Sequence, residues 1–250
     1  MIITFKRVII ITILIVFSTT ISVSAQNDTR CKALGDELDS LIKDVLHMKP
    51  NPLFPNSTEN RDLFCRPSKE VLKKANIYAK CLPRFQSQVI SIVAKGTRKP
   101  VKQICDGNGT KIIETYSCMD QSFKEALHKQ ESIFLNSLIV IKEKISQDKV
   151  HSAFCCTARN ISESLLVNLP QIKCKDDPTI NLPKYFYNLI EASLGDTLDL
   201  ICGSFPSFKV CLEKAVDSVK LLEDNYSSAI DTKETPLVES VLSIISKLAS

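Results

Sequence analysis

The residues most able to perform chemistry in this sequence are its ten cysteines and three histidines. Such residues bind zinc when they recur at short spacing, as in C-x-x-C, and a C-x-x-C pair also exchanges thiols and disulfides. No C-x-x-C occurs, and His47, His128 and His151 lie far apart in the chain. The sequence therefore predicts neither a metal site nor a redox centre.

Other catalytic signatures are also missing. The stretch DGNGTKIIETYS, residues 106–117, begins like a calcium loop, but Lys111 stands where such a loop needs glycine and Ser117 where it needs glutamate. We interpret it as a turn. There is no G-x-S-x-G, phosphate-binding loop, H-E-x-x-H or dinucleotide fingerprint. We therefore expect a protein without catalytic residues and without a cofactor.

The N-terminus predicts export. Lys6 and Arg7 precede a ten-residue apolar run, Val8 to Phe17, and small residues follow at Val23-Ser24-Ala25. This pattern predicts a signal peptide over residues 1–25. An uncleaved anchor is the alternative, but the run is shorter than the roughly 20 residues that span a bilayer. We expect a secreted, extracellular chain with no membrane span after cleavage.

An even number of cysteines behind a secretory signal is typical of a disulfide framework. The expected disulfide cysteines are Cys31, Cys65, Cys81, Cys105, Cys118, Cys155, Cys156, Cys174, Cys202 and Cys211. The sequence also contains five N-glycosylation triplets, which need exposed positions to be used. They predict a glycoprotein modified at Asn27, Asn56, Asn108, Asn160 and Asn225.

Six glycines and no tryptophan in 250 residues favour helices over an all-β fold, which needs many tight turns. Apolar residues recur at helical spacing in most segments. We expect an all-α fold, a disulfide-stapled helical array. One expected helix starts near Cys31, a second runs from Pro67-Ser68 to Pro83, and a third follows Cys118. Further helices are expected over residues 84–95, 110–118, 149–168, 183–202, 206–224 and 236–249. The last of these has Thr235 as its expected N-cap.

Two groups of four cysteines have nearly equal spans. Residues 65 to 118 and 155 to 211 cover 53 and 56 positions with similar local sequence, which indicates a tandem duplication. We therefore expect helical units at 26–118 and 119–250, the second including a C-terminal amphipathic helix. If each unit closes its own four cysteines, Cys31 joins one of the adjacent pair. Up-and-down helices further suggest Cys65–Cys105 and Cys155–Cys202. A competing alignment matches Cys31 with Cys118 and Cys211 and reassigns the bonds.

The adjacent Cys155 and Cys156 cannot easily bond to each other, because a disulfide needs Cα atoms about 4.4–6.8 Å apart. The pair therefore predicts two bonds that leave one helix for two neighbours.

Two further stretches bear on binding. Residues 132–145 are apolar nearly all round, so Phe134, Leu138, Ile141 and Ile145 form either core or the lining of an apolar ligand site. The densest basic stretch, KGTRKPVKQ at 95–103, is read as a solvated loop, with a weak polyanion contact as the alternative. Loss of Lys6 and Arg7 with the signal lowers the formal charge from +4 to +2, so we expect no nucleic-acid partner.

The segments AFCCTARNISESLL, DLICGSFPSFKVCLEKA and TPLVESVLSIISKL resemble secreted, cysteine-rich helical proteins of arthropods, in particular the 27 kDa haemolymph glycoprotein family. This resemblance implies an exported helical glycoprotein without an assigned catalytic activity. Our hypothesis is a non-enzymatic extracellular protein that binds another protein. The alternative is a carrier of an apolar small molecule.

Overall fold

The computed structural model describes residues 29–45, 54–106, 110–172, 174, 179–225 and 236–249. These ranges contain helices and turns but no β-strand, and the prediction of a disulfide-stapled all-α fold is confirmed. The expected signal peptide, Asn27, Asn108 and Thr235 lie outside the described residues. The helices are residues 29–45, α2 (Thr58–Tyr78), α3 (Arg84–Cys105), α4 (Thr110–Ser117), α5 (Gln121–Lys144), α6 (Val150–Asn168), α7 (Leu182–Cys202), α8 (Phe208–Lys214), α9 (Val216–Glu223) and α10 (Leu237–Ala249).

The prediction that a helix starts at Pro67 is wrong, because that proline lies inside α2. The helix begins earlier, where the Ser57 side chain accepts a hydrogen bond from the Asn60 backbone N–H at 3.1 Å. Serine is among the best N-cap residues, since it satisfies a backbone donor that has no partner within the helix. An internal proline costs a hydrogen bond. Burial of the neighbouring Phe64 and Cys65 offsets that cost.

Two other boundaries differ from the prediction. The helix expected over 84–95 continues through Pro100 to Cys105, so the basic stretch at 95–103 is helix and not a loop. Pro100 and Val101 are buried there, and their packing compensates for the lost backbone bond. The helix expected over 206–224 is divided into α8 and α9 by Ala215, whose backbone angles of −135° and 37° are not helical.

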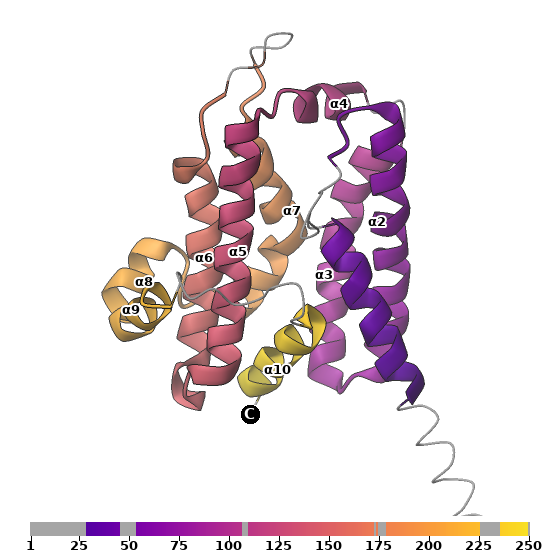
Figure 1. Cartoon of the computed structure of the whole chain (residues 1–250). Helices are drawn as coiled ribbons and strands as arrows, with labels where there is room; N and C mark the ends of the chain where they lie inside the picture. Colours follow the sequence, from indigo (N-terminus) through magenta and orange to yellow (C-terminus); the bar gives the residue numbers. More distant parts are fainter. Residues whose placement is uncertain are drawn as a thin grey trace, which may run out of the picture.

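The helices form two antiparallel hairpins joined by a central helix (Figure 1). α2 and α3 form one hairpin, beside the helix of residues 29–45, and α5 and α6 form the other. α7 packs against both α3 and α6, so it connects the two hairpins. α4 crosses between the hairpins at one end, α8 and α9 lie outside α6, and α10 lies toward the opposite end. No helix in the described ranges is long and apolar enough to cross a membrane.

α10 closes the core between the hairpins. Its Ile244 is fully buried in a cluster with Leu138 and Ile141 of α5 and Val150 of α6. Its first turn is held by the helix of residues 29–45, because Asp39 Oδ1 accepts a hydrogen bond from the Val238 backbone N–H at 2.9 Å. A carboxylate at a helix N-terminus also interacts favourably with the helix dipole.

All ten cysteines are paired, as Cys31–Cys81, Cys65–Cys105, Cys118–Cys174, Cys155–Cys202 and Cys156–Cys211. Five such bonds are typical of an oxidising environment. Each closes a loop of 40 to 56 residues, which contributes about 4 kcal/mol by restricting the unfolded chain.

The expected bonds Cys65–Cys105 and Cys155–Cys202 are present, but the pairing of Cys31 with one of the adjacent cysteines is wrong. The expectation that each group of four closes on itself is also wrong, because Cys118 bonds to Cys174. The helix of residues 29–45 packs beside α2, so Cys31 reaches Cys81 in the 3₁₀ turn Ala79–Cys81 that follows α2. Within Cys31, Cys65, Cys81 and Cys105 the first bonds the third and the second the fourth. Cys118, Cys155, Cys174 and Cys202 repeat this pattern, as in the competing alignment of Cys31 with Cys118.

The adjacent cysteines bond in different directions, as predicted. Cys155 ties α6 to Cys202 at the end of α7, and Cys156 ties it to Cys211 of α8. Both sulfur pairs are buried, because all four residues are at most 1% exposed. The vicinal pair therefore fixes α6 to two neighbours at once.

α3 approaches α7 closely at Gly96. A Cβ atom built on Gly96 would lie only 2.4 Å from the backbone oxygen of Ser193, so no larger residue fits without moving one helix. Gly195 of α7 has no such restriction, since its nearest atom would be the Glu191 side-chain oxygen at 3.5 Å.

We predict opposite effects for the two glycines. Gly96→Ala should lower the free energy of unfolding by about 1–3 kcal/mol, because it forces α3 and α7 apart. Gly195→Ala should raise it by about 0.5–1 kcal/mol, because alanine is the better helix former. Denaturant unfolding of both variants measures the difference, and equal effects would contradict the close approach at Gly96.

Candidate functional site

A pocket of about 520 Å³ lies where the end of α3, α4 and the start of α7 meet. Two stretches far apart in the sequence line it, residues 103–115 and 179–188. The lining residues are Gln103, Asp106, Thr110, Ile112, Thr115, Thr179, Ile180, Asn181, Lys184, Tyr185 and Asn188. Its volume lies within the usual range of small-ligand sites.

Two disulfides hold the walls of this pocket. Cys65–Cys105 fixes the last residue of α3, immediately before Asp106. Cys118–Cys174 joins the residue that follows α4 to the segment that precedes α7. The pocket is therefore assembled from pieces that are covalently fixed to the scaffold.

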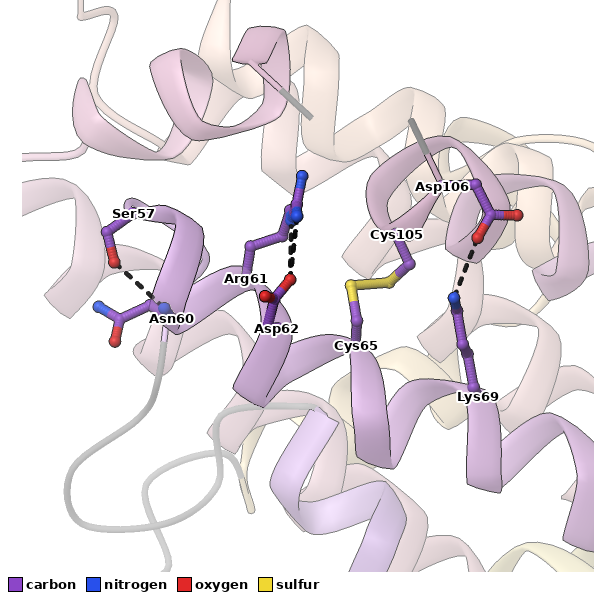
Figure 2. A network of polar contacts seen from close by, with 8 residues as sticks. All are labelled: Ser57, Asn60, Arg61, Asp62, Cys65, Lys69, Cys105 and Asp106. Atoms are coloured by element: carbon purple, nitrogen blue, oxygen red, sulfur yellow. Dashed lines mark hydrogen bonds and ion pairs between the residues drawn. A yellow bond between two sulfur atoms is a disulfide. The ribbon is translucent and has the colours of Figure 1, made fainter. Parts of the chain in front are cut away.

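Figure 2 shows the α2 side of this region. Lys69 of α2 extends toward Asp106 beside the Cys65–Cys105 bond, with Nζ and Oδ1 3.0 Å apart. Both side chains are about half exposed, so the pair contributes at most about 1 kcal/mol. Its main effect is positional, because it orients the one carboxylate among the lining residues.

The rim of the pocket is polar and the inner surface is mixed. Its exposed lining side chains are amides, hydroxyls, one carboxylate and the Lys184 ammonium group, while Thr115 is buried and Ile112, Ile180 and Tyr185 are partly buried. Lys184 makes no ion pair within the described part of the chain. Asn181 begins α7, and its Oδ1 accepts a hydrogen bond from the Lys184 backbone N–H at 2.9 Å.

Tyr185 connects the pocket to the aromatic core beneath it. Its ring meets Tyr116 edge-on at 6.1 Å between centroids and Phe186 at 5.5 Å. Burial raises the pKa of Tyr185. Burial also raises the pKa of Tyr116, with smaller contributions from the neighbouring Tyr185 and Glu131, so both phenols stay protonated at neutral pH. The Tyr185 hydroxyl is buried and makes no hydrogen bond to the described residues.

The pocket is suited to hydrogen bonding. Its lining includes donors and acceptors of several kinds but no sulfur and no imidazole. His128 lies on α5 beside Glu131 at 3.7 Å, and His151 contacts the Ile201 carbonyl at 2.7 Å, so the structure does not bring these two histidines together. The described residues hold no cluster of three or more side chains suited to a metal ion.

The structure places the predicted apolar ligand-lining residues in the core. Leu138, Ile141 and Ile145 are buried and Phe134 is partly buried, packed with α6 and α10. None of the four lines the pocket between α3, α4 and α7.

No local sequence motif identified this pocket. Its residues come from segments separated by up to 85 positions, from Gln103 to Asn188. The polar stretch containing Asp106 and Thr110 was interpreted as a turn, and no sequence pattern joined it to residues 179–188.

The glycosylation triplets occupy different environments. Asn56 is exposed just before α2. Asn160 lies in the middle of α6 and is partly buried, and Ser162 of its triplet is only 2% exposed. Asn225 follows α9 and is partly buried, with its Oδ1 accepting from Lys144 Nζ at 2.7 Å.

We predict that Asn56 carries a glycan and that Asn160 does not, because a glycan at Asn160 would have to leave a helix packed on its neighbours. Peptide mass spectrometry after enzymatic deglycosylation in ¹⁸O water tests both sites. An occupied Asn160 with an unmodified Asn56 would contradict the assignment.

No protein-family model, no curated protein and no solved structure matches this chain.

Proposed function

We propose that this chain is a secreted, non-enzymatic binding protein that receives a polar segment of an extracellular protein in the pocket between α3, α4 and α7. One observation carries the proposal: hydrogen-bonding side chains from residues 103–115 and 179–188 converge on a pocket whose walls are disulfide-linked. The five disulfides and the resemblance to arthropod haemolymph glycoproteins support an extracellular role.

Covalently fixed walls favour binding because a partner need not order them. Ordering of loops and side chains is a major cost of association, and a preorganised site avoids part of it. Cys105 and Cys118 hold the ends of α3 and α4 that border the pocket.

The chemistry of the lining favours a polar occupant over an apolar cargo. Sites for apolar ligands are lined mainly by hydrophobic side chains. Here the exposed positions are polar, and the Tyr185 hydroxyl lies buried without a hydrogen bond to any of the residues that the structure describes. A buried hydroxyl without a hydrogen bond costs about 1–3 kcal/mol, so a polar group that bonds to it gains affinity.

Filling the pocket should abolish binding. Asn188 is exposed and lines the pocket, so Asn188→Trp should block it without disturbing the core. A photo-crosslinking group at Lys184 captures the partner from the source fluid. The affinity of this partner for the Asn188→Trp variant, measured by biolayer interferometry, should be at least about tenfold lower than for the unmodified chain.

Lys129→Trp serves as the control, because Lys129 is exposed on α5 and does not line the pocket. Its affinity should match that of the unmodified chain. Equal affinities for all three proteins would place the binding surface elsewhere.

Two disulfides that close loops of nearly equal length allow effects on stability and on binding to be told apart. Cys118–Cys174 and Cys156–Cys211 close 56 and 55 residues, so removing either by Cys→Ala pairs should cost a similar free energy, about 4 kcal/mol. Of these two bonds, Cys118–Cys174 borders the pocket and Cys156–Cys211 does not, so loss of the first alone should also weaken partner binding. Denaturant unfolding and interferometry on both variants measure the two quantities, and equal losses of affinity would contradict the proposal.

A further inference from the structure

α3 carries positive charge only. Its 22 residues, RFQSQVISIVAKGTRKPVKQIC, contain five arginines and lysines and no aspartate or glutamate. The second half of the helix concentrates four of these cations between Lys95 and Lys102, over about 10 Å of helix axis.

These four cations share the solvent face of α3. Lys95, Arg98, Lys99 and Lys102 follow the i, i+3, i+4, i+7 spacing that places residues on one side of a helix. All four are exposed, and none has an ion pair within the described ranges. The other sides of the helix are occupied, because Gly96 faces α7 and Cys105 bonds to α2.

α2 extends this cationic face. Arg66, Lys69 and Lys73 recur at helical spacing, and Lys69 reaches Asp106 directly after α3, so this row lies beside the C-terminal end of the α3 row. Arg66 and Lys73 are exposed, and Lys73 is only loosely paired with Glu70 at 3.9 Å.

The charge of the whole chain is unevenly distributed. Residues 58–105 contain eleven lysines and arginines and three acidic residues, a formal charge of +8, whereas the complete chain carries +4. The remaining residues therefore sum to −4. Such an asymmetry produces a local positive potential that the net charge conceals.

We propose that the cationic face formed by Lys95, Arg98, Lys99 and Lys102, with Arg66 and Lys73 beside it, binds a sulfated polysaccharide. Clusters of lysine and arginine are typical of heparin and nucleic-acid sites. The five disulfides favour the extracellular polyanion over nucleic acid. Between Lys95 and Lys102, α3 exposes no large apolar side chain of the kind that anchors helices in membranes.

This face is separate from the pocket at the end of α3, because none of its six residues lines that pocket. The polysaccharide proposal therefore does not depend on the proposed protein partner.

The test compares two variants of the disulfide-bonded chain on immobilised heparin. The first replaces Lys95, Arg98, Lys99 and Lys102 by glutamine. The second replaces Lys129, Lys209, Lys214 and Lys220, which are exposed, lie on α5, α8 and α9, and make no ion pair within the described part of the chain. Both lose four positive charges, so net charge is matched.

We expect the first variant to bind heparin roughly ten- to a hundredfold more weakly at 50 mM salt. The slope of log affinity against log salt should fall by roughly 3, because fewer counterions are released. The second variant should stay within about twofold of the unmodified chain, and desulfated heparin should not bind. The single substitution Lys99→Glu should weaken heparin binding at least about threefold. This variant tests the same face while changing only one residue.

Three results would overturn the proposal. The first is that the unmodified chain shows no retention on heparin at 50 mM salt, and the second is that both glutamine variants lose affinity equally. Tighter binding to double-stranded DNA or to phosphatidylserine vesicles than to heparin, at the same salt, would assign the face to another class of partner.

Discussion

The backbone contact between α3 and α7 organises this molecule. Because Gly96 has no side chain, the two helices approach until the Ser193 carbonyl occupies the space of a Cβ atom. This contact joins the α2–α3 hairpin to α7, and the two helices run antiparallel, with Gly96 beside Ser193 and Gln103 near Asn188. It also brings the end of α3 beside the start of α7, where the pocket forms, and turns the cations of α3 toward solvent.

The disulfides complement this packing where the apolar core is divided. Buried side chains gather in several separate clusters, such as the α5–α6–α10 cluster and the smaller one around Cys155, Leu198 and Cys202. A divided core stabilises each contact less than one large core would. Cross-links between helices supply the missing restraint, and two of them border the pocket.

Much of the fold follows from local sequence, and the site does not. Apolar spacing predicts α7 nearly to the residue and the presence of α5 after Cys118, because amphipathic periodicity is a local property. The extent of α2 and α3 was not predictable, since tertiary burial around Pro67 and Pro100 outweighs the preference of proline for helix ends.

The pocket and most disulfide partners depend on which helices become neighbours. Cysteine spacing predicted the wrong partner for Cys31, because the packing of residues 29–45 on α2 selects Cys81. Gln103 and Asn188 likewise meet only because α3 and α7 run antiparallel. The four cations of α3 were visible in the sequence, but their common face required the knowledge that Pro100 does not end the helix.

The vicinal cysteines have a consequence for oxidative folding. Successive side chains of an α-helix point about 100° apart. If Cys155 and Cys156 exchanged partners, α6 would have to rotate by about that angle to reach α7 and α8, and it would turn Ala153 and Leu165 out of the interior. Correct pairing of these two neighbouring cysteines therefore fixes the rotation of α6 about its own axis during oxidative folding.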